Sequence, residues 1–589
     1  MIPDKFGKSV HGTWSCVECH KDVTEIPHKA GVIHKVNCVN CHNAVWNAAK
    51  KGNKTQANAQ LGVVVQQIDS YFKSVHARPS REDQSRANAI CYDCHAPHYI
   101  YPKSSAERAE WRLSIPNTCG KCHPKEREQY ATSVHGRAVL NDRNPTAAIC
   151  SDCHSTHDVA DPANDAAKLA ITKNCGGCHA ESLKTYTETY HGKVNTLGYA
   201  NTAKCFDCHG SHGIQGVANP KSTIHPDNRL MTCRKCHAGA TKGFSTFEPH
   251  GTAHDLLRYP AIWVASKIML VMVVSAIAFF WSHAALWFYR EYQEHKQGRS
   301  RPQVKIDELL EGKFKGKHFQ RFSLIWRIAH LTVIVSLMIL TLTGMSVLYP
   351  DTTWAPVVIH WLGGPMIEAV IHRIFAVVLA IVFFVQLIYF VVHTVRNRGT
   401  FDLFGPDSLA PRLQDLWDIF AMFKWFFGMG PKPAFGRWTY WQKFDYWASF
   451  SVVAFIGICG VMLWVPSVTA ALLPGWVLNV VTIFHGEGAL LAVLFLFTVH
   501  FFNNHFRPDK FPLEVVMFTG SMPLEQFKYE HRVEFNRLVA SGELRNYLVD
   551  APSQPMTVGA RMLGFTLIAL GLLLLVMVLM GVFKAMAGV

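Results

Sequence analysis

Residues 91–98 read CYDCHAPH, residues 150–157 read CSDCHSTH, and residues 205–212 read CFDCHGSH. Each phrase contains Cys-x-x-Cys-His, a pattern that occurs eight times and uses sixteen of the seventeen cysteines. It is the attachment signature of c-type haem, in which two thiols bond to the haem vinyl groups and the next histidine ligates the iron. Zinc knuckles and disulfide frameworks do not require a histidine after every cysteine pair, so the sequence predicts covalent haem.

The signature assigns a role to each residue of the eight motifs. The cysteines predicted to hold haem are Cys16, Cys19, Cys38, Cys41, Cys91, Cys94, Cys119, Cys122, Cys150, Cys153, Cys175, Cys178, Cys205, Cys208, Cys233 and Cys236. The predicted proximal iron ligands are His20, His42, His95, His123, His154, His179, His209 and His237. The expected complement is therefore eight covalent c-haems.

The motifs belong to a longer repeat. A unit opens on a histidine, usually followed by glycine, continues with Cys-x-Asp-Cys-His-x-x-His, and ends on a second Cys-x-x-Cys-His. Self-similarity at this spacing indicates an array of stacked units. The candidate distal ligands are His11, His28, His76, His98, His135, His157, His191 and His212, with His250 from an unfinished fifth opening. An iron with two histidine ligands has no vacant position, so this domain is predicted to carry electrons rather than bind a substrate.

The chain divides into two unlike halves. Residues 1–258 are polar and hold all the motifs, whereas residues 259–589 contain long runs of Leu, Val, Phe and Trp. We expect short helices and loops packed around haem in the first half, and an all-α transmembrane bundle of six helices in the second. The net charge of +15 does not indicate a nucleic-acid partner, because much of the basic charge lies in loops beside the apolar runs.

Six stretches are long enough to cross a bilayer, which takes roughly 20 apolar residues: 261–288, 324–348, 366–393, 446–465, 476–502 and 559–583. The loops 290–321, 394–443 and 507–561 carry nine, seven and seven Lys or Arg, and 349–371 and 466–484 carry none. The positive-inside rule puts the basic loops in the cytoplasm and the haem domain in the periplasm of a bacterial inner membrane. No signal peptide is visible at the start of the sequence, so export is inferred from the haems.

Histidines inside the predicted spans indicate further haem, because ionisable residues in a membrane are costly and usually functional. His485 and His500 are fifteen residues apart, which is about 22 Å along a helix and suits two stacked haems. Matching the depths of the histidines in the predicted spans pairs His372 with His485 near the outer end and His330 with His500 near the inner end. Two b-haems are expected there, with Arg327 and Arg373 as candidate propionate partners and Glu487 and Asp445 as weaker candidate proton acceptors near quinol.

The second half resembles the di-haem cytochrome b subunits of formate dehydrogenase and nickel hydrogenase. The stretches concerned are RIAHLTVIVSLMILTLTG, HRIFAVV, GRWTYWQKFDYW and HGEGALLAVLFLFTVH, within about residues 320–505. The four span histidines match the haem-bearing helices of that family in order, and the resemblance implies that quinone meets the cytoplasmic-side haem. The first half resembles multihaem cytochromes with paired motifs. The whole is similar to inner-membrane cytochrome bc fusions of the CbcL type, which implies menaquinol oxidation with electrons passed to periplasmic cytochromes.

The leading hypothesis is a quinol dehydrogenase that passes electrons from menaquinol through two b-haems and eight c-haems to a periplasmic acceptor. The reverse reaction, quinone reduction fed by a periplasmic donor, would use the same ligands. An electron-transfer subunit of a larger respiratory complex is a further alternative. The sequence is compatible with two kinds of assembly, such a complex and a homo-oligomer. A catalytic c-haem domain that reduces nitrogen or sulfur oxyanions would need a five-coordinate haem, which the surplus of distal histidines disfavours. The expected partners are membrane lipid, quinone and a periplasmic redox protein, with no nucleic acid.

Overall fold

The computed structural model describes residues 2–25, 27, 35–298, 314, 316–397 and 402–587. The chain forms two compact units, Met1–Ala240 and Thr241–Val589. Residues 241–258, which the sequence places in the polar half, form hydrogen bonds within the second unit. The Thr241 hydroxyl donates to the Ala470 carbonyl at 2.8 Å, and the Asn479 amide donates to the Glu248 carbonyl at 2.9 Å.

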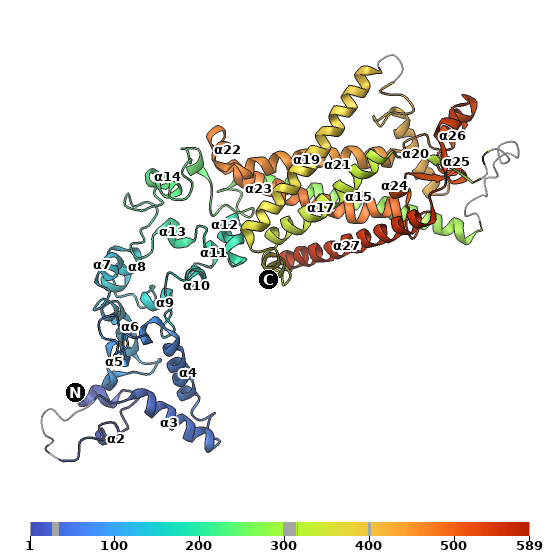
Figure 1. Ribbon diagram of the computed structural model, residues 1–589. Helices are drawn as coiled ribbons and strands as arrows, with labels where there is room; N and C mark the ends of the chain where they lie inside the picture. The colour runs from blue at the N-terminus through green and yellow to red at the C-terminus, as the bar shows by residue number, and fades with distance from the viewer. Residues whose placement is uncertain are drawn as a thin grey trace. The chain divides into compact units, whose positions relative to one another are not determined.

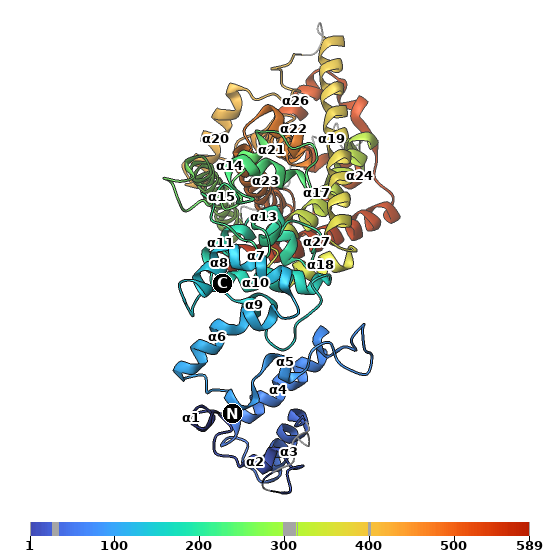
Figure 2. The same cartoon turned by 90° about the vertical axis from the view of Figure 1, so that its left-hand side faces the viewer.

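The first unit consists of short helices joined by loops, as the sequence predicts (Figures 1 and 2). Its α-helices are α1 (Pro3–Gly7), α2 (Cys16–Cys19), α3 (Cys38–Lys51), α4 (Ala59–Lys73), α5 (Cys91–Cys94), α6 (Ala106–Cys119), α7 (Pro124–Thr132), α8 (Val134–Leu140), α9 (Cys150–His154), α10 (Asp165–Gly176), α11 (Ala180–Thr187), α12 (Tyr190–Thr196), α13 (Cys205–His209) and α14 (Pro226–Arg234). Two 3₁₀ turns, η1 (Val75–Ala77) and η2 (Pro97–Tyr99), lie between them.

The aspartate of Cys-x-Asp-Cys-His explains why a helix begins at the first motif of a unit. The carboxylates of Asp93, Asp152 and Asp207 accept the backbone N–H three residues earlier, at 2.8, 2.8 and 2.9 Å. This contact satisfies an N–H group that the first helical turn leaves unpaired, and it places negative charge at the positive end of the helix. Each first motif is thereby fixed on a single capped turn.

A tyrosine ties the opening of each later unit to its first motif. Tyr71, Tyr130 and Tyr186 lie five residues before the opening histidines, and their hydroxyls donate at 2.7–2.8 Å to the carbonyl two residues before the motif. The glycine after the opening histidine packs against the same segment. A Cβ at Gly136 would overlap the Tyr130 carbonyl oxygen. Packing therefore requires glycine after His135 and, through the same contact with the Tyr186 carbonyl, after His191, whereas the repeat that opens at His76 has Ala77.

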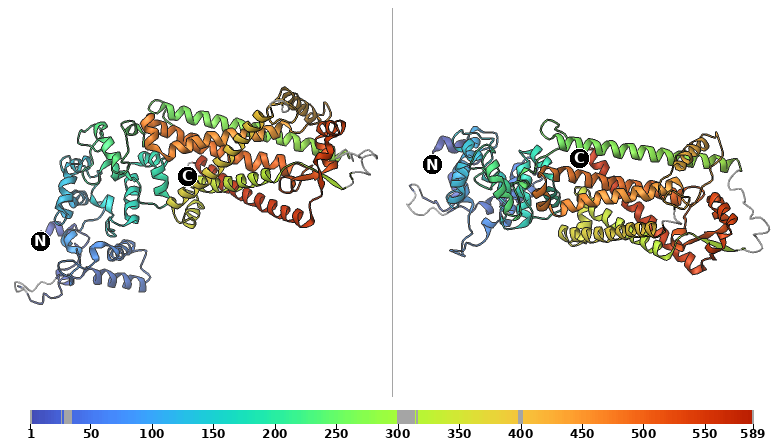
Figure 3. Two further views of the ribbon diagram at one scale, coloured as in Figure 1. Left: turned by 45° about the horizontal axis from the view of Figure 1, so that its top comes forward. Right: turned by 90° about the horizontal axis from the view of Figure 1, so that it is seen from above.

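Within its described residues, the second unit contains six helices long and apolar enough to span a membrane, in agreement with the sequence (Figure 3). They are α15 (Pro260–Lys296), α17 (Leu324–Leu348), α19 (Pro365–Arg396), α21 (Tyr440–Trp464), the helix Trp476–Phe506, and α27 (Gln554–Ala587). The fifth begins as α23 (Trp476–Leu494) and widens into the π-helical segments η4 (Phe495–His500) and η5 (Phe502–Phe506). Shorter elements connect the spans: η3 (Phe244–Thr246), α18 (Ala355–Trp361), α20 (Leu413–Phe426) and α22 (Pro466–Leu472).

A small α/β subdomain, here called the cap, is built from two basic loops. It comprises β1 (Lys317–Gln320), α24 (Val516–Thr519), β2 (Ser521–Pro523), α25 (Leu524–Glu530), α26 (Arg532–Ala540), η6 (Glu543–Tyr547) and β3 (Leu548–Asp550). Its antiparallel sheet has the order β2-β1-β3. Phe319, Phe527 and Phe535 lie in its core. Burying these aromatic side chains holds together segments that are about 200 residues apart in sequence.

Candidate metal centres

In the first unit, seven motif histidines each face a second histidine. The ring centres are 6.0–6.4 Å apart in the pairs His11–His42, His20–His98, His76–His123, His95–His157, His135–His179, His154–His212 and His191–His237. Metal–imidazole bonds are about 2 Å long, so one iron between two imidazoles puts the ring centres roughly 6 Å apart. The spacing of the seven pairs therefore fits two histidines on opposite sides of a haem iron.

The pairs follow a rule that the sequence does not reveal. The opening histidine of a sequence repeat faces the histidine of the second motif in the same repeat, as His135 faces His179. The last histidine of Cys-x-Asp-Cys-His-x-x-His faces the first-motif histidine of the preceding repeat, as His157 faces His95. Each pair of this second kind therefore links two successive repeats.

Two of the distal candidates do not belong to these seven pairs. His28 lies outside the described residues. His250 stays a candidate distal ligand that the sequence assigns to no particular motif.

Hydrogen bonds at Nδ1 and burial put several of these histidines in a form that suits a metal ligand. His157 Nδ1 contacts the Gln67 side-chain oxygen at 2.7 Å, and His11 Nδ1 contacts the Pro97 carbonyl at 3.2 Å. Such contacts at Nδ1 leave Nε2 available to iron. Burial, together with the neighbouring His157 and Arg108, lowers the pKa of His95 to about 4. This histidine therefore stays neutral at physiological pH, which is the form that ligates metal.

Contacts between cysteines place successive motifs next to one another. Three pairs of cysteines from successive repeats lie side by side: Cys38 and Cys91, Cys119 and Cys150, and Cys175 and Cys205. Within a unit, burial and the nearby Cys175 and Cys178 raise the pKa of Cys153 to about 11. The corresponding neighbours in the other units are Cys19 with Cys41, Cys94 with Cys119, and Cys208 with Cys233. The eight motifs are therefore neighbours in the order of the sequence.

The outer pair in the membrane unit has the same face-to-face arrangement. The rings of His372 on α19 and His485 on α23 are 6.3 Å apart. His372 Nδ1 contacts the Thr343 hydroxyl of α17 at 2.8 Å, and His485 Nδ1 contacts the Ile456 carbonyl of α21 at 3.0 Å. Four helices thus meet at this pair, and its geometry fits a b-type haem.

Glycines make room for both ligand rings. A Cβ at Gly344 would lie 3.2 Å from His372 Cε1, and a Cβ at Gly460 would lie 3.1 Å from His485 Cε1. Both distances are tighter than ordinary van der Waals contact. Glycine at these two positions allows α17 and α21 to approach the imidazole rings closely.

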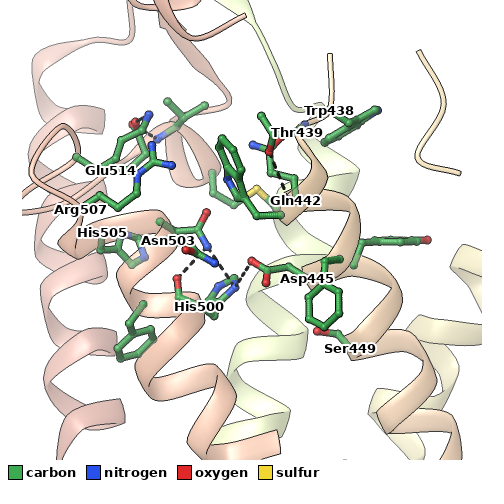
Figure 4. Close-up of a pocket in the computed structure, with 18 of the residues that line it drawn as sticks. Trp438, Thr439, Gln442, Asp445, Ser449, His500, Asn503, His505, Arg507 and Glu514 are labelled. Carbon is green, nitrogen blue, oxygen red and sulfur yellow. Dashed lines mark hydrogen bonds and ion pairs between the residues drawn. The ribbon is translucent and has the colours of Figure 1, made fainter. Parts of the chain in front are cut away.

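A cavity of about 840 Å³ lies between the spans and the cap, and it contains the inner histidines. His330 and His500 both line it. So does His505, which the sequence analysis did not identify and which Figure 4 shows near His500. His500 and His505 are five residues apart and would point in different directions on an α-helix. The π-helical segments change the direction of both side chains, and the buried Nδ1 of His505 has no hydrogen-bond partner in the described part of the chain.

The arginines near the inner histidines, Arg327 and Arg507, fit haem propionates better than Arg373, which lies near the outer pair. Arg327 has a buried Nε without a hydrogen-bond partner among the described residues, and Arg507, which lines the cavity, has such an Nη1. Arg373 instead stacks on the Trp464 ring, with 5.4 Å between the guanidinium carbon and the ring centre. Arg507 therefore joins Arg327 as a candidate, and it was missed because it lies beyond the predicted end of the fifth span.

The two candidate proton acceptors occupy different places. Asp445 on α21 lines the cavity and forms an ion pair with His500, with 3.4 Å between Oδ2 and Nδ1 (Figure 4). Glu487 is not among the cavity-lining residues that the structure describes. Glu487 instead lies near Tyr349. Burial of the tyrosine and the negative charge of this carboxylate together raise the pKa of Tyr349. Only Asp445 is placed next to a candidate ligand of the inner haem.

Comparison with known proteins agrees with the geometry of the membrane unit. The chain is 22% identical over 153 residues to the cytochrome b556(Fdn) subunit of the nitrate-inducible formate dehydrogenase of Escherichia coli K12, and equally to that of Shigella flexneri. The match covers 26% of this chain and 62% of the relative, so the chain spans less than two thirds of the length of the curated relatives it matches. No family model matches. The C-terminal part thus distantly resembles a cytochrome b subunit, and this resemblance implies haem b.

Proposed function

We propose that this chain is a membrane quinol dehydrogenase that passes the electrons of menaquinol to a periplasmic acceptor. The observation that carries the proposal is the set of facing histidine pairs in both units, seven in the first and one in the second. The distant similarity to a cytochrome b subunit supports it. Haem bound between such pairs supplies one-electron transfer at its iron, with no open position for a substrate.

The chain contributes the ligands and their orientation. The sixteen motif cysteines and eight proximal histidines would hold c-haem, and the candidate distal histidines, His250 included, would complete the coordination. His372 and His485 would hold the outer b-haem, and His330 and His500 the inner one. The propionates of the inner haem would meet Arg327 and Arg507, with Arg373 as the outer candidate.

The cavity at the inner end is the proposed quinol site. Its walls combine apolar residues such as Trp438 and Phe444 with many polar and charged groups. Small-molecule sites likewise combine apolar surface with polar groups that fix the orientation of the ligand. Oxidation of quinol to quinone releases two electrons and two protons. Asp445 lines this cavity and is the candidate that accepts a proton, whereas Glu487 would serve only a site near the outer end.

A stopped-flow experiment on the oxidised protein in lipid tests the proposal. After addition of a menaquinol analogue, the b-type α-band should be reduced first and the c-type band next, and a quinone-site inhibitor should block both. The proposal fails if quinol leaves both bands oxidised. If a reduced periplasmic donor then fills the c-band before the b-band, the chain is a quinone reductase.

The similarity to one subunit of a multisubunit dehydrogenase favours a second candidate, an electron-transfer subunit of a larger complex. In that case the isolated chain would show rapid exchange between b- and c-bands but no reduction by quinol. Gentle extraction from its native membrane would recover it with additional subunits.

A further inference from the structure

The two histidine sites in the membrane unit differ in what their Nδ1 atoms contact. At the outer site the partners are neutral: the Thr343 hydroxyl at 2.8 Å from His372 and the Ile456 carbonyl at 3.0 Å from His485. The Thr343 hydroxyl donates its own hydrogen to the Ile339 carbonyl at 2.7 Å, so it accepts from the imidazole. At the inner site, the partner of His500 is the Asp445 carboxylate, at 3.4 Å.

Asp445 is the acceptor that a metal-bound His500 requires. When Nε2 ligates iron, Nδ1 carries the hydrogen and needs an acceptor. The Asn504 side-chain nitrogen is also near, at 3.2 Å from Nδ1, but it is a donor and already donates to the His500 carbonyl at 2.9 Å. Turning the amide round would place its oxygen against that carbonyl. The carboxylate is therefore the acceptor left for the imidazole.

Asp445 has no ion pair with a lysine or arginine among the described residues. Four of the basic residues that line the cavity have acidic partners of their own: Arg507 with Asp509 at 2.9 Å, Lys510 with Glu514 and Glu530 at 2.5 Å, Lys432 with Glu291 at 2.7 Å, and Arg321 with Glu534 at 3.6 Å. Lys528 and Arg532 also line the cavity, and neither forms an ion pair with Asp445 in the part of the chain that the structure describes. His500 is the ionic partner of Asp445 there, and the carboxylate Oδ1 is buried without a hydrogen bond. A buried carboxylate is poorly screened by solvent ions.

We propose that Asp445 tunes the inner haem through His500, so that the inner b-haem has the lower reduction potential of the two. A carboxylate on Nδ1 makes the imidazole a stronger electron donor and stabilises the oxidised iron, whereas neutral partners do so less. An electron is then more stable at the outer site than at the inner one. This order favours movement from the quinol cavity toward the outer end. The inference rests on the proposed function, because it requires His500 to be an iron ligand.

Optical redox titration of the full-length protein, combined with EPR of its low-spin haems, tests this role. Asp445→Asn keeps the shape and removes the charge. It should raise the lower of the two b-type midpoints, narrow the gap between them and shift one EPR signal. Thr343→Val is the matched control at the outer site, and it should raise only the higher midpoint.

An unmoved lower midpoint in D445N, or a shift of the higher one, would overturn the inference. If D445N loses a b-haem, Asp445→Ser is the second neutral variant. It offers the hydroxyl acceptor that His372 already has, and the same rise is expected. Pyridine haemochrome analysis distinguishes the two failures. Fewer than two b-haems in the unmodified protein would contradict the proposed ligands, whereas two b-haems with unchanged midpoints would contradict the role of Asp445 alone.

Discussion

At the scale of single residues, the inner of the two histidine sites in the membrane unit contains three histidines, whereas a haem with two histidine ligands needs only two. His330, His500 and His505 all line the cavity, but only His500 forms an ion pair with a carboxylate. Metal-ligating histidines almost always have such an outer partner. We therefore predict that His500→Ala loses one of the two b-haems and that His505→Ala, its matched control, retains both. The b-to-c haem ratio from pyridine haemochrome spectra measures this, and loss in H505A alone would transfer the ligand role to His505.

The outer pair could be predicted from depth alone, whereas the membership of the inner site could not. His372 and His485 lie on the α-helical segments α19 and α23, where residue counting gives the depth of a side chain, and their rings face each other. Around His500 the helix is π-helical, and nothing in the sequence FLFTVHFFNNHF marks that change of geometry. On an α-helix, His505 would point well away from His500, which is why it was overlooked.

At the scale of elements, the repeat that opens at His135 depends on a close approach at Gly136, whereas the repeat that opens at His76 has Ala77 at the same place. A Cβ at Gly136 would overlap the backbone oxygen of Tyr130, which cannot move away as a flexible side chain could. Overpacking of this kind costs about 1–3 kcal/mol. We predict that Gly136→Ala lowers both the thermal unfolding midpoint and the yield of fully haem-loaded protein. Gly216→Ala is the control, because a Cβ added there would have no neighbouring atom within 4 Å. It should leave the unfolding midpoint and the haem-loaded yield unchanged, and an equal loss in this variant would refute the packing argument.

The cap should lose stability as the pH falls. Burial and the nearby Arg321 lower the pKa of His531 to about 3, from an ordinary value of 6.5. The unfolded chain therefore binds a proton first, so the contribution of His531 is complete above pH 6.5 and is lost as the pH falls toward 3. The cost is up to about 1.4 kcal/mol per pH unit. We predict faster proteolysis within residues 521–550 at pH 5 than at pH 7.5.

The variant His531→Gln should reduce that acid sensitivity, because glutamine does not titrate. Its amide can still donate to the Gly436 carbonyl, which His531 Nδ1 contacts at 2.6 Å. His318 also has a lowered pKa, caused mainly by burial, and adds to the trend in the same direction. His318→Gln separates the two contributions. Unaltered acid sensitivity in both variants would rule out histidine protonation as the cause.

The six spans and the short motif helices were predictable, but the cap was not. Each span is a long apolar run, and each first motif has its own capping aspartate, so both signals are local. The three strands of the cap have only three or four residues each and come from opposite ends of the membrane unit. Strands this short show no alternating pattern, and their pairing depends on contacts between distant segments.

At the scale of the whole molecule, the repeat predicted a haem array but not how its units are joined. Each unit supplies two spare histidines, which allows several assignments. In the structure seven of the spare histidines face a motif histidine: one histidine stays within its repeat, as His135 faces His179, and the other, such as His157, faces the preceding repeat. This crossing links successive repeats into one series, in which neighbouring cysteines follow the order of the motifs.

A linear series predicts that an electron trap acts according to its position. The last motif histidine, His237, precedes the membrane unit by four residues, so we expect electrons from quinol to enter at this end. His76 faces His123 in the fourth motif, and His11 faces His42 in the second. Replacing either distal histidine with methionine raises the potential at that motif, because a methionine ligand stabilises reduced haem.

In stopped-flow reduction by quinol, His76→Met should hold electrons at the fourth motif and delay the three motifs beyond it. The fast phase of the c-band should then fall to about five eighths of its amplitude, since motifs four to eight are still reached directly. His11→Met, the matched variant nearer the far end, should keep about seven eighths, because only the first motif lies beyond it. Equal losses in the two variants would show that the motifs do not form a single line, since in a branched array a trap at one site leaves other routes open.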